Sequence, residues 1–197
     1  MKRLLYIHGF LSSPASFKAQ QVKQWLQQHH PDVDFICPHL SPYPDETAVT
    51  LRNLIQQHES DKLGVMGSSL GGFWAHWVAE TFHMNAVLVN PAVSPQQFMP
   101  DYLGRPLKGY YSDDIYQLNA EHLQQIIRYD SPVLHPERLW LLVQTGDETL
   151  DYRQAVTKFS RCKQTVEVGG DHAFTGFERY LASSFEFLFH GRAPIDK

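Results

Sequence analysis

The stretch Gly67-Ser68-Ser69-Leu70-Gly71-Gly72 decides the fold of this chain, because it joins a short apolar run to an amphipathic one. The run before it, Leu63–Met66, has the length and composition of a buried strand, and the run after it has apolar residues at helical spacing. Glycines two positions on either side of Ser69 leave room for a sharp turn between the strand and the helix. Such a turn exposes the Ser69 hydroxyl as a nucleophile and sets the backbone N–H of Leu70 at a helix N-terminus.

This turn has two other interpretations besides a nucleophilic Ser69. The first is a glycine-rich strand-to-helix turn with no catalytic role. The second is a phosphate-binding loop, which is disfavoured because Gly72-Phe73 stands where Lys followed by Ser or Thr is required.

The rest of the chain repeats the alternation of short apolar runs with longer amphipathic ones. The runs predict six strands, at Arg3–Ile7, Val33–Cys37, Leu63–Met66, Ala86–Val89, Leu139–Gln144 and Thr165–Val168. The amphipathic segments predict helices from Ser13-Pro14 to before Pro31, at Asp45–Gln57, after Gly67, and at Tyr152–Ser160 and Phe177–Phe189. This pattern indicates an α/β fold, a three-layer sandwich with a mainly parallel six-stranded sheet.

Composition limits the classes of protein that the chain can represent. Its 197 residues fit one domain, 1–197, and a hydrophobic content of 43% excludes disorder. A net charge of −4 with no basic stripe argues against nucleic acid as a partner. No apolar run reaches the roughly 18 residues that a membrane span requires. The apolar run at the N-terminus is too short for a signal peptide. Cys37 and Cys162 are predicted to be small buried residues of a cytoplasmic protein.

One long segment interrupts the alternation. Residues 92–137 separate two predicted strands, where a typical connection takes about 2–6 residues. The aromatic residues of this segment, Phe98 and Tyr102 among them, predict a lid that walls a substrate pocket. The alternative is a helical crossover, for which Leu118–Ile127 alone is long enough.

A nucleophilic serine needs a base and a carboxylate that orients it. His172 follows the last predicted strand, and the carboxyl ends of parallel strands meet at one edge of a sheet, so it should face Ser69. Asp147 is the first acid after Leu139–Gln144 and is the predicted orienting carboxylate. Asp151 is the alternative, although its position suggests a helix N-cap. Glu148 and Asp171 are expected to point elsewhere.

The remaining part of such a site is a pair of donors for an oxyanion. The backbone N–H groups of Phe10 and Leu70 are the candidates, since His8-Gly9-Phe10 ends the first strand. His8 is expected to shape that loop by hydrogen bonding. The histidines and cysteines show no zinc-binding spacing, so the sequence predicts neither a metal nor a cofactor.

The order Ser69, Asp147, His172 is that of the α/β-hydrolases. The sequence resembles, over nearly its whole length, the YqiA family of small bacterial esterases. The resemblance rests on five stretches, Leu5–Phe10, Gly67–Gly72, Val89–Val93, Gln144–Glu148 with Asp151–Val156, and Gly169–Phe174. It implies an α/β-hydrolase sandwich with a small lid insertion, and a hydrolase of carboxylic esters or acyl thioesters with Ser69, Asp147 and His172 as the catalytic triad.

Other functions are compatible with the same residues. An amidase or an acyltransferase would use the same triad with a different acyl acceptor. A non-catalytic α/β-hydrolase-fold binding or scaffold protein would keep the fold without turnover, since fold does not imply function. The complete order of triad residues counts against the scaffold. The expected partner is therefore a small-molecule ester or thioester.

Overall fold

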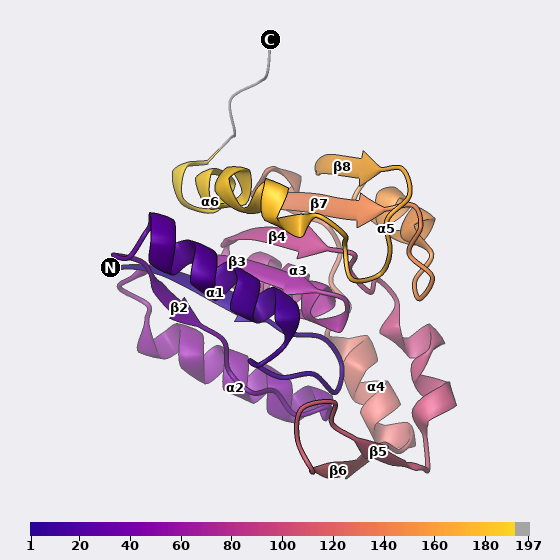
Figure 1. Cartoon of the computed structure of the whole chain (residues 1–197). Helices are drawn as coiled ribbons and strands as arrows, with labels where there is room; N and C mark the ends of the chain where they lie inside the picture. The colour runs from indigo at the N-terminus through magenta and orange to yellow at the C-terminus, as the bar shows by residue number, and fades with distance from the viewer. Residues whose placement is uncertain (192–197) are drawn as a thin grey trace.

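The computed structural model describes residues 1–191, and a six-stranded sheet lies at its centre (Figure 1). The strands are β1 (Lys2–Ile7), β2 (Asp34–Ile36), β3 (Lys62–Ser68), β4 (Asn85–Val89), β7 (Leu139–Gln144) and β8 (Lys163–Glu167). They are ordered β2-β1-β3-β4-β7-β8, and every neighbouring pair is parallel. All six predicted strands are present, which confirms the α/β class.

The strands are apolar on both faces because each face is covered by helices. Leu4 and Tyr6 of β1 pack on one side, while Leu5 and Ile7 pack on the other. The first face is covered by α1 (Phe17–His29) and α6 (Leu181–His190). The second face is covered by α2 (Pro44–Gln57), α3 (Leu70–Phe82) and α5 (Tyr152–Lys158). The result is the expected three-layer sandwich.

The sequence placed the start of α1 wrongly. The helix begins at Phe17, not at Ser13-Pro14, and Ser16 takes the N-cap position. Ser13 instead closes a turn: its hydroxyl accepts a hydrogen bond from the N–H of Ala15 at 3.0 Å, and its carbonyl accepts one from the N–H of Ser16 at 3.0 Å. A serine that bonds its own backbone two residues on favours a turn over a helix start.

Two further expectations need correction. The last helix is preceded by a 3₁₀ segment, Phe177–Tyr180, before α6 begins. Cys37 and Cys162 are free thiols, as expected, but both are only partly buried. Burial raises the pKa of Cys37 to about 12 and that of Cys162 to about 11, so both are protonated near neutral pH.

Strand order creates a crevice beside β1. The chain leaves β1 for β2 on one side, and later returns to place β3 on the other side. Ligands of open parallel sheets bind outside the strand carboxyl ends at such a point of reversal. Ser69 follows β3 and Phe10 follows β1, so both lie at this crevice.

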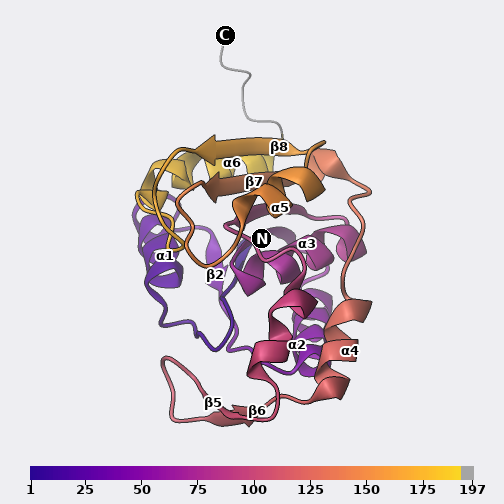
Figure 2. The same cartoon turned by 90° about the vertical axis from the view of Figure 1, so that its right-hand side faces the viewer.

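Residues 92–137 contain both a helix and a separate hairpin. The segment includes 3₁₀ turns at Pro95–Gln97, Met99–Tyr102 and Pro136–Arg138, the hairpin of β5 (Pro106–Lys108) and β6 (Ile115–Gln117), and α4 (Ala120–Arg128). Helix α4 lies beside α2, while the hairpin lies away from the main sheet (Figure 2). Arg128 and Tyr129 both donate hydrogen bonds to Asp45, which fixes the end of α4 against α2. No helix in residues 1–191 is long and apolar enough to cross a membrane.

Candidate active site

Ser69 occupies the turn between β3 and α3 in a strained backbone conformation. Its φ is 56° and its ψ is −125°, a region that non-glycine residues rarely adopt. Neighbouring backbone holds it there: the Ser69 N–H donates to the carbonyl of Val89 at 3.1 Å, and the N–H of Ala92 donates to the Ser69 carbonyl at 2.9 Å. The strain is therefore maintained by the end of the adjacent strand, β4.

The glycines of the motif are required by close backbone contacts. A Cβ on Gly67 would overlap the carbonyl of Gly71, and a Cβ on Gly71 would overlap the carbonyl oxygen of Ile7. A Cβ on Gly72 would lie only 2.6 Å from the Cβ of Pro91. Helix α3 can start directly against the ends of β1 and β4 only because these side chains are absent.

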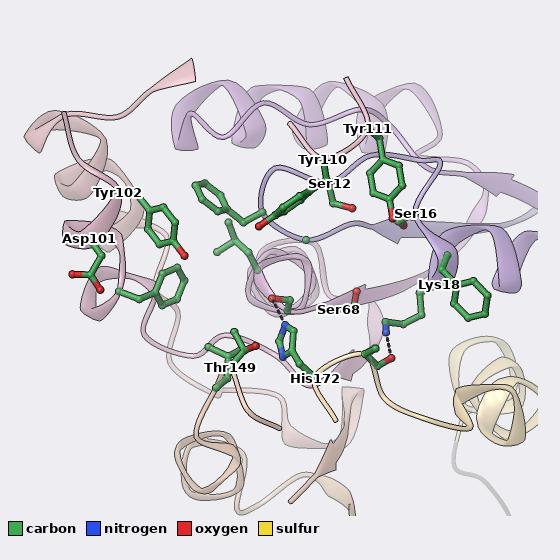
Figure 3. A pocket seen from close by; sticks show the side chains of 18 residues that line it. Ser12, Ser16, Lys18, Ser68, Asp101, Tyr102, Tyr110, Tyr111, Thr149 and His172 are labelled. Atoms are coloured by element: carbon green, nitrogen blue, oxygen red, sulfur yellow. Dashed lines mark hydrogen bonds between the residues drawn. The ribbon is translucent and has the colours of Figure 1, made fainter. Parts of the chain in front are cut away.

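The structure brings together the three residues predicted as a triad. Nε2 of His172 lies 3.1 Å from Oγ of Ser69, an interaction drawn in Figure 3. Nδ1 of the same ring lies 2.9 and 2.8 Å from the two carboxylate oxygens of Asp147. The side chain of Asp147 is 2% exposed and that of His172 is 22% exposed. The acid is thus shielded from water, while the imidazole remains accessible from the cavity.

The surroundings of Asp147 favour its ionised form. Burial alone would raise the pKa of this carboxyl. The hydrogen bond from His172 and the backbone N–H groups of Leu150 and Thr149, at 2.8 and 2.9 Å, outweigh burial and hold the pKa below its usual value. A carboxylate at this position can stabilise an imidazolium on His172.

The other acids of these loops have different roles. Asp151 caps α5, accepting a hydrogen bond from the N–H of Arg153 at 3.0 Å, as its position suggested. Asp171 accepts one from the hydroxyl of Thr175 at 2.8 Å. Glu148 was expected to point away, but its carboxylate accepts a hydrogen bond from the backbone N–H of His172 at 3.0 Å. Asp147 therefore bonds the ring of His172, while the next residue, Glu148, bonds its backbone N–H.

The backbone of Phe10 and Leu70 lies beside Ser69. Both residues line the same cavity as the serine, and Leu70 is the first residue of α3, whose N–H has no acceptor within the helix. Nε2 of His8 accepts a hydrogen bond from the N–H of Leu40 at 3.0 Å, so its Nδ1 carries the proton and donates to the carbonyl of Gly9 at 2.9 Å. His8 thus shapes the loop after β1, as the sequence suggested.

A cavity of about 820 Å³ opens over Ser69. Tyr102 and Asp101 lie at one end, Ser16 and Lys18 lie at the other, and His172 lies between them (Figure 3). Phe98 also lines this cavity, so both residues predicted to form the substrate pocket belong to the cavity that contains Ser69. Among residues 1–191, no cluster of three or more His, Cys, Asp or Glu side chains could hold a metal ion.

Lys18 and two buried amides near the site were missed from the sequence. The ammonium of Lys18 donates to the carbonyl of Ala173, and burial lowers the pKa of Lys18 to about 8 although Asp171 and Asp147 oppose the shift. A single lysine near a helix start carries no signal of such a contact. Asn90 directly follows the apolar run of β4, and Gln144 ends that of β7. An amide at the end of an apolar run is the sequence signal that could have indicated these two buried residues.

Comparison with known proteins identifies the family. A model of the uncharacterised protein family UPF0227 matches residues 3–189. The chain belongs to the UPF0227 family. UPF0227 proteins of Pectobacterium atrosepticum and Yersinia pseudotuberculosis are 28% identical over 104 residues and 36% identical over 107 residues. Each match spans 52% of this chain and 58% of the relative's length. This membership confirms the family resemblance inferred from the motifs.

Solved structures show the same fold at low sequence identity. Est1E from Butyrivibrio proteoclasticus with ferulic acid has a TM-score of 0.75 and 15% identity, covering 97% of this chain and 89% of that one. Mouse α/β-hydrolase domain-containing protein 10 has a TM-score of 0.71 and 15% identity, covering 95% and 88%. The thioesterase domain from the curacin biosynthetic pathway has a TM-score of 0.63 and 13% identity, covering 93% and 91%. This chain therefore has the α/β-hydrolase fold.

Replacing Asp147 tests the orientation of His172. In Asp147→Asn, the amide oxygen keeps the bonds from Thr149 and Leu150, which turns the NH₂ group toward Nδ1 of His172. That arrangement places the imidazole proton on Nε2, where it prevents acceptance of the Ser69 proton. We expect kcat for an activated ester to fall roughly 10⁴-fold, as in other triads.

The matched control is Asp151→Asn, four residues further on. Asparagine is also a good N-cap, so kcat should stay within about threefold of wild type. Activity that survives in Asp147→Asn but is lost in Asp151→Asn would assign the orienting acid to Asp151.

Proposed function

We propose that this UPF0227 protein is a serine hydrolase that cleaves carboxylic esters or acyl thioesters through an acyl-enzyme intermediate. One observation carries the proposal: Nε2 of His172 lies 3.1 Å from Oγ of Ser69, while the buried Asp147 holds the opposite ring nitrogen. A hydroxyl within hydrogen-bond reach of an oriented base is the arrangement that activates a serine nucleophile.

In the acylation step, Oγ of Ser69 attacks the carbonyl carbon of the substrate while Nε2 of His172 takes the hydroxyl proton. Asp147 stabilises the imidazolium that forms. The carbonyl oxygen becomes an oxyanion that accepts hydrogen bonds from the backbone N–H groups of Phe10 and Leu70. Collapse of the tetrahedral intermediate breaks the bond to the alcohol or thiol, which takes the proton from His172 as it leaves.

In the deacylation step, a water molecule takes the position beside His172 that the departed alcohol or thiol occupied. His172 accepts a proton from this water, the hydroxide attacks the acyl carbonyl, and the same two backbone donors bind the second oxyanion. The proton returns through His172 to Oγ of Ser69 as the carboxylic acid is released. No step in this sequence uses a metal or a cofactor.

The expected substrate is a small ester or thioester. The cavity of about 820 Å³ is in the range of small-molecule sites and combines aromatic with polar lining. Among structures of the same fold, Est1E is described with bound ferulic acid, a carboxylic acid, and the curacin domain is a thioesterase. The cytoplasm is the proposed compartment, because Cys37 and Cys162 are both free thiols.

Residues 92–137 are proposed to act as a lid insertion within a single hydrolase domain. The ring of Tyr102 packs edge-on against that of Phe10, with 5.2 Å between centroids, and so contacts the loop after β1. The N–H of Tyr110, in the hairpin loop, donates to the carbonyl of Leu11 at 2.8 Å. These contacts support the proposed lid, because Tyr102 and Tyr110 line the same cavity as Ser69 and would enclose an acyl chain there.

Hydrolysis of p-nitrophenyl esters and of an acyl thioester tests the proposed activity. Ser69→Ala and His172→Ala should each lower kcat roughly 10⁶-fold, leaving only the residual rate that substrate binding and the oxyanion donors supply, as in comparable triads. Ser184→Ala is the matched control, because its hydroxyl is fully buried in α6 and has no hydrogen-bond partner within residues 1–191. It should leave kcat unchanged.

A folded wild-type protein with no turnover of any of these substrates would favour the non-catalytic scaffold. Turnover that persists in folded Ser69→Ala would instead show that another group is the nucleophile. Amide cleavage faster than ester hydrolysis would show that the protein is an amidase. Acyl transfer faster than hydrolysis would show that the acyl acceptor is not water. Both outcomes would leave the proposed triad unchanged.

The proposed lid predicts a change in acyl-chain preference. Tyr102→Ala and Phe98→Ala each remove a ring from the cavity, so the ratio of kcat/KM between octanoyl and butyryl esters should change roughly tenfold or more. Tyr116→Ala is the control: it lies in the same insertion and packs against Tyr43, but it does not line the cavity. Equal changes in all three variants, matched by equal losses of Tm, would show that the effect is structural.

A further inference from the structure

Asn90 lies directly after β4 and is 3% exposed. Its Nδ2 donates two hydrogen bonds, to the carbonyl of Asp171 at 3.0 Å and to that of His172 at 3.1 Å. Its Oδ1 accepts a hydrogen bond from the N–H of Gln144 at 3.0 Å. One buried amide therefore joins the loop that carries His172 to the end of β7, three residues before Asp147.

Residues on both sides of Asn90 hold the nucleophile. The carbonyl of Val89 accepts the N–H of Ser69 at 3.1 Å, and the N–H of Ala92 donates to the carbonyl of Ser69 at 2.9 Å. This follows from the sheet order, in which β4 lies between β3 and β7 (Figure 1). The β4-end segment, residues 89–92, thus contacts the loops that carry Ser69 and His172 and the end of β7, the strand that leads to Asp147.

The loop of His172 depends on such side-chain bonds because it has an irregular backbone. Gly169, Gly170 and Phe174 all have positive φ values, of 81°, 73° and 60°. Gln144 holds the other side of this loop: its Oε1 accepts the N–H of Asp171 at 3.1 Å, and its Nε2 donates to the carbonyl of Thr175 at 2.8 Å. Two buried amides therefore fix the backbone on either side of the catalytic base.

We propose that Asn90 is a positioning residue, which sets the distance between His172 and Ser69 through the carbonyl groups of Asp171 and His172. The inference rests on the proposed hydrolase function and deepens it. Asn90 does not line the cavity, so it acts on the backbone of the histidine and not on the substrate. A displacement of about 1 Å in such a group can cost roughly 100-fold in rate.

The chemistry of the contact requires an amide. The two carbonyl oxygens each accept a hydrogen bond from the NH₂ group of Asn90. An ionised carboxylate in its place could only accept hydrogen bonds and could not donate any. In Asn90→Asp, a negative charge would therefore face the carbonyls of Asp171 and His172, and the loop would move away from Ser69. Protonation of the introduced carboxyl would restore one O–H donor.

The other end of β4 supplies a matched control. Nδ2 of Asn85 donates to two consecutive carbonyls as well, those of Phe187 at 3.2 Å and Leu188 at 3.3 Å. These carbonyls belong to α6, and Asn85 is the first residue of β4, at the opposite end of the strand from Asn90. Asn85→Asp therefore introduces the same chemical change on the same strand, away from the site.

The test compares kcat and KM for a p-nitrophenyl ester in Asn90→Asp, Asn85→Asp and wild type between about pH 5 and pH 8. Asn90→Asp should lower kcat about 100-fold near neutral pH with KM little changed, whereas Asn85→Asp should lower only Tm. Burial and the two facing carbonyl oxygens should raise the pKa of the introduced carboxyl, so the ratio of the Asn90→Asp rate to the wild-type rate should rise toward pH 5 as this carboxyl becomes protonated. His172, Asp147, Glu148 and Asp171, the charged and ionisable groups of the adjoining loops, are present in all three proteins, so the pH profile of Asn85→Asp is the control for their contribution.

A second readout does not depend on turnover. The proton between His172 and Asp147 should give a downfield ¹H NMR signal that shifts or disappears in Asn90→Asp and persists in Asn85→Asp. If Asn90→Asp fails to fold, Asn90→Ser, which keeps one donor on a shorter side chain, should show an intermediate loss of kcat and the same NMR change.

Equal losses of kcat in the Asn90 and Asn85 variants, or an unchanged signal in the folded Asn90 variant, would overturn the proposal. Loss of the hydrolase function itself would be recognised separately, by turnover that is absent in wild type or survives in Ser69→Ala.

Discussion

The architecture of the site depends on one close backbone approach, that of Gly71 to the carbonyl of Ile7 at the end of β1. This contact lets α3 start against the sheet, and Ser69, in the turn before α3, has a positive φ and its hydroxyl at the crevice. It also brings the N–H of Leu70 beside the loop of Phe10. A side chain at Gly71 would separate α3 from β1 and so move Ser69 and Leu70 away from His172 and Phe10.

Features that follow from local pattern could be predicted from the sequence. Strands buried on both faces are continuous apolar runs, and glycines two positions from Ser69 mark a turn with no room for side chains. The order of strands then brings Ser69, Asp147 and His172 to one edge, and the structure places them within hydrogen-bond reach. These inferences needed only periodicity, spacing and the geometry of parallel sheets.

Features that depend on contacts between distant loops could not be predicted. Glu148 was expected to point away, yet it holds the backbone of His172, because the loop after β8 folds back over the loop after β7. The role of Asn90 arises from the position of β4 between β3 and β7, which no local pattern encodes. Even the start of α1 was misplaced, since the turn at Ser13 competes with the helix for the same hydroxyl.

We propose that Ser69 is an activated nucleophile, and a fluorophosphonate probe distinguishes such a serine from an ordinary one. An ordinary serine hydroxyl does not react with such a probe, whereas a serine with an oriented base and two oxyanion donors forms a stable phosphonyl adduct. We expect intact-mass and peptide mass spectrometry to show one adduct, on Ser69 and not on the neighbouring Ser68, that is absent in His172→Ala. A folded wild-type protein that remains unlabelled, or that is labelled at another residue, would show that Ser69 is not an activated nucleophile.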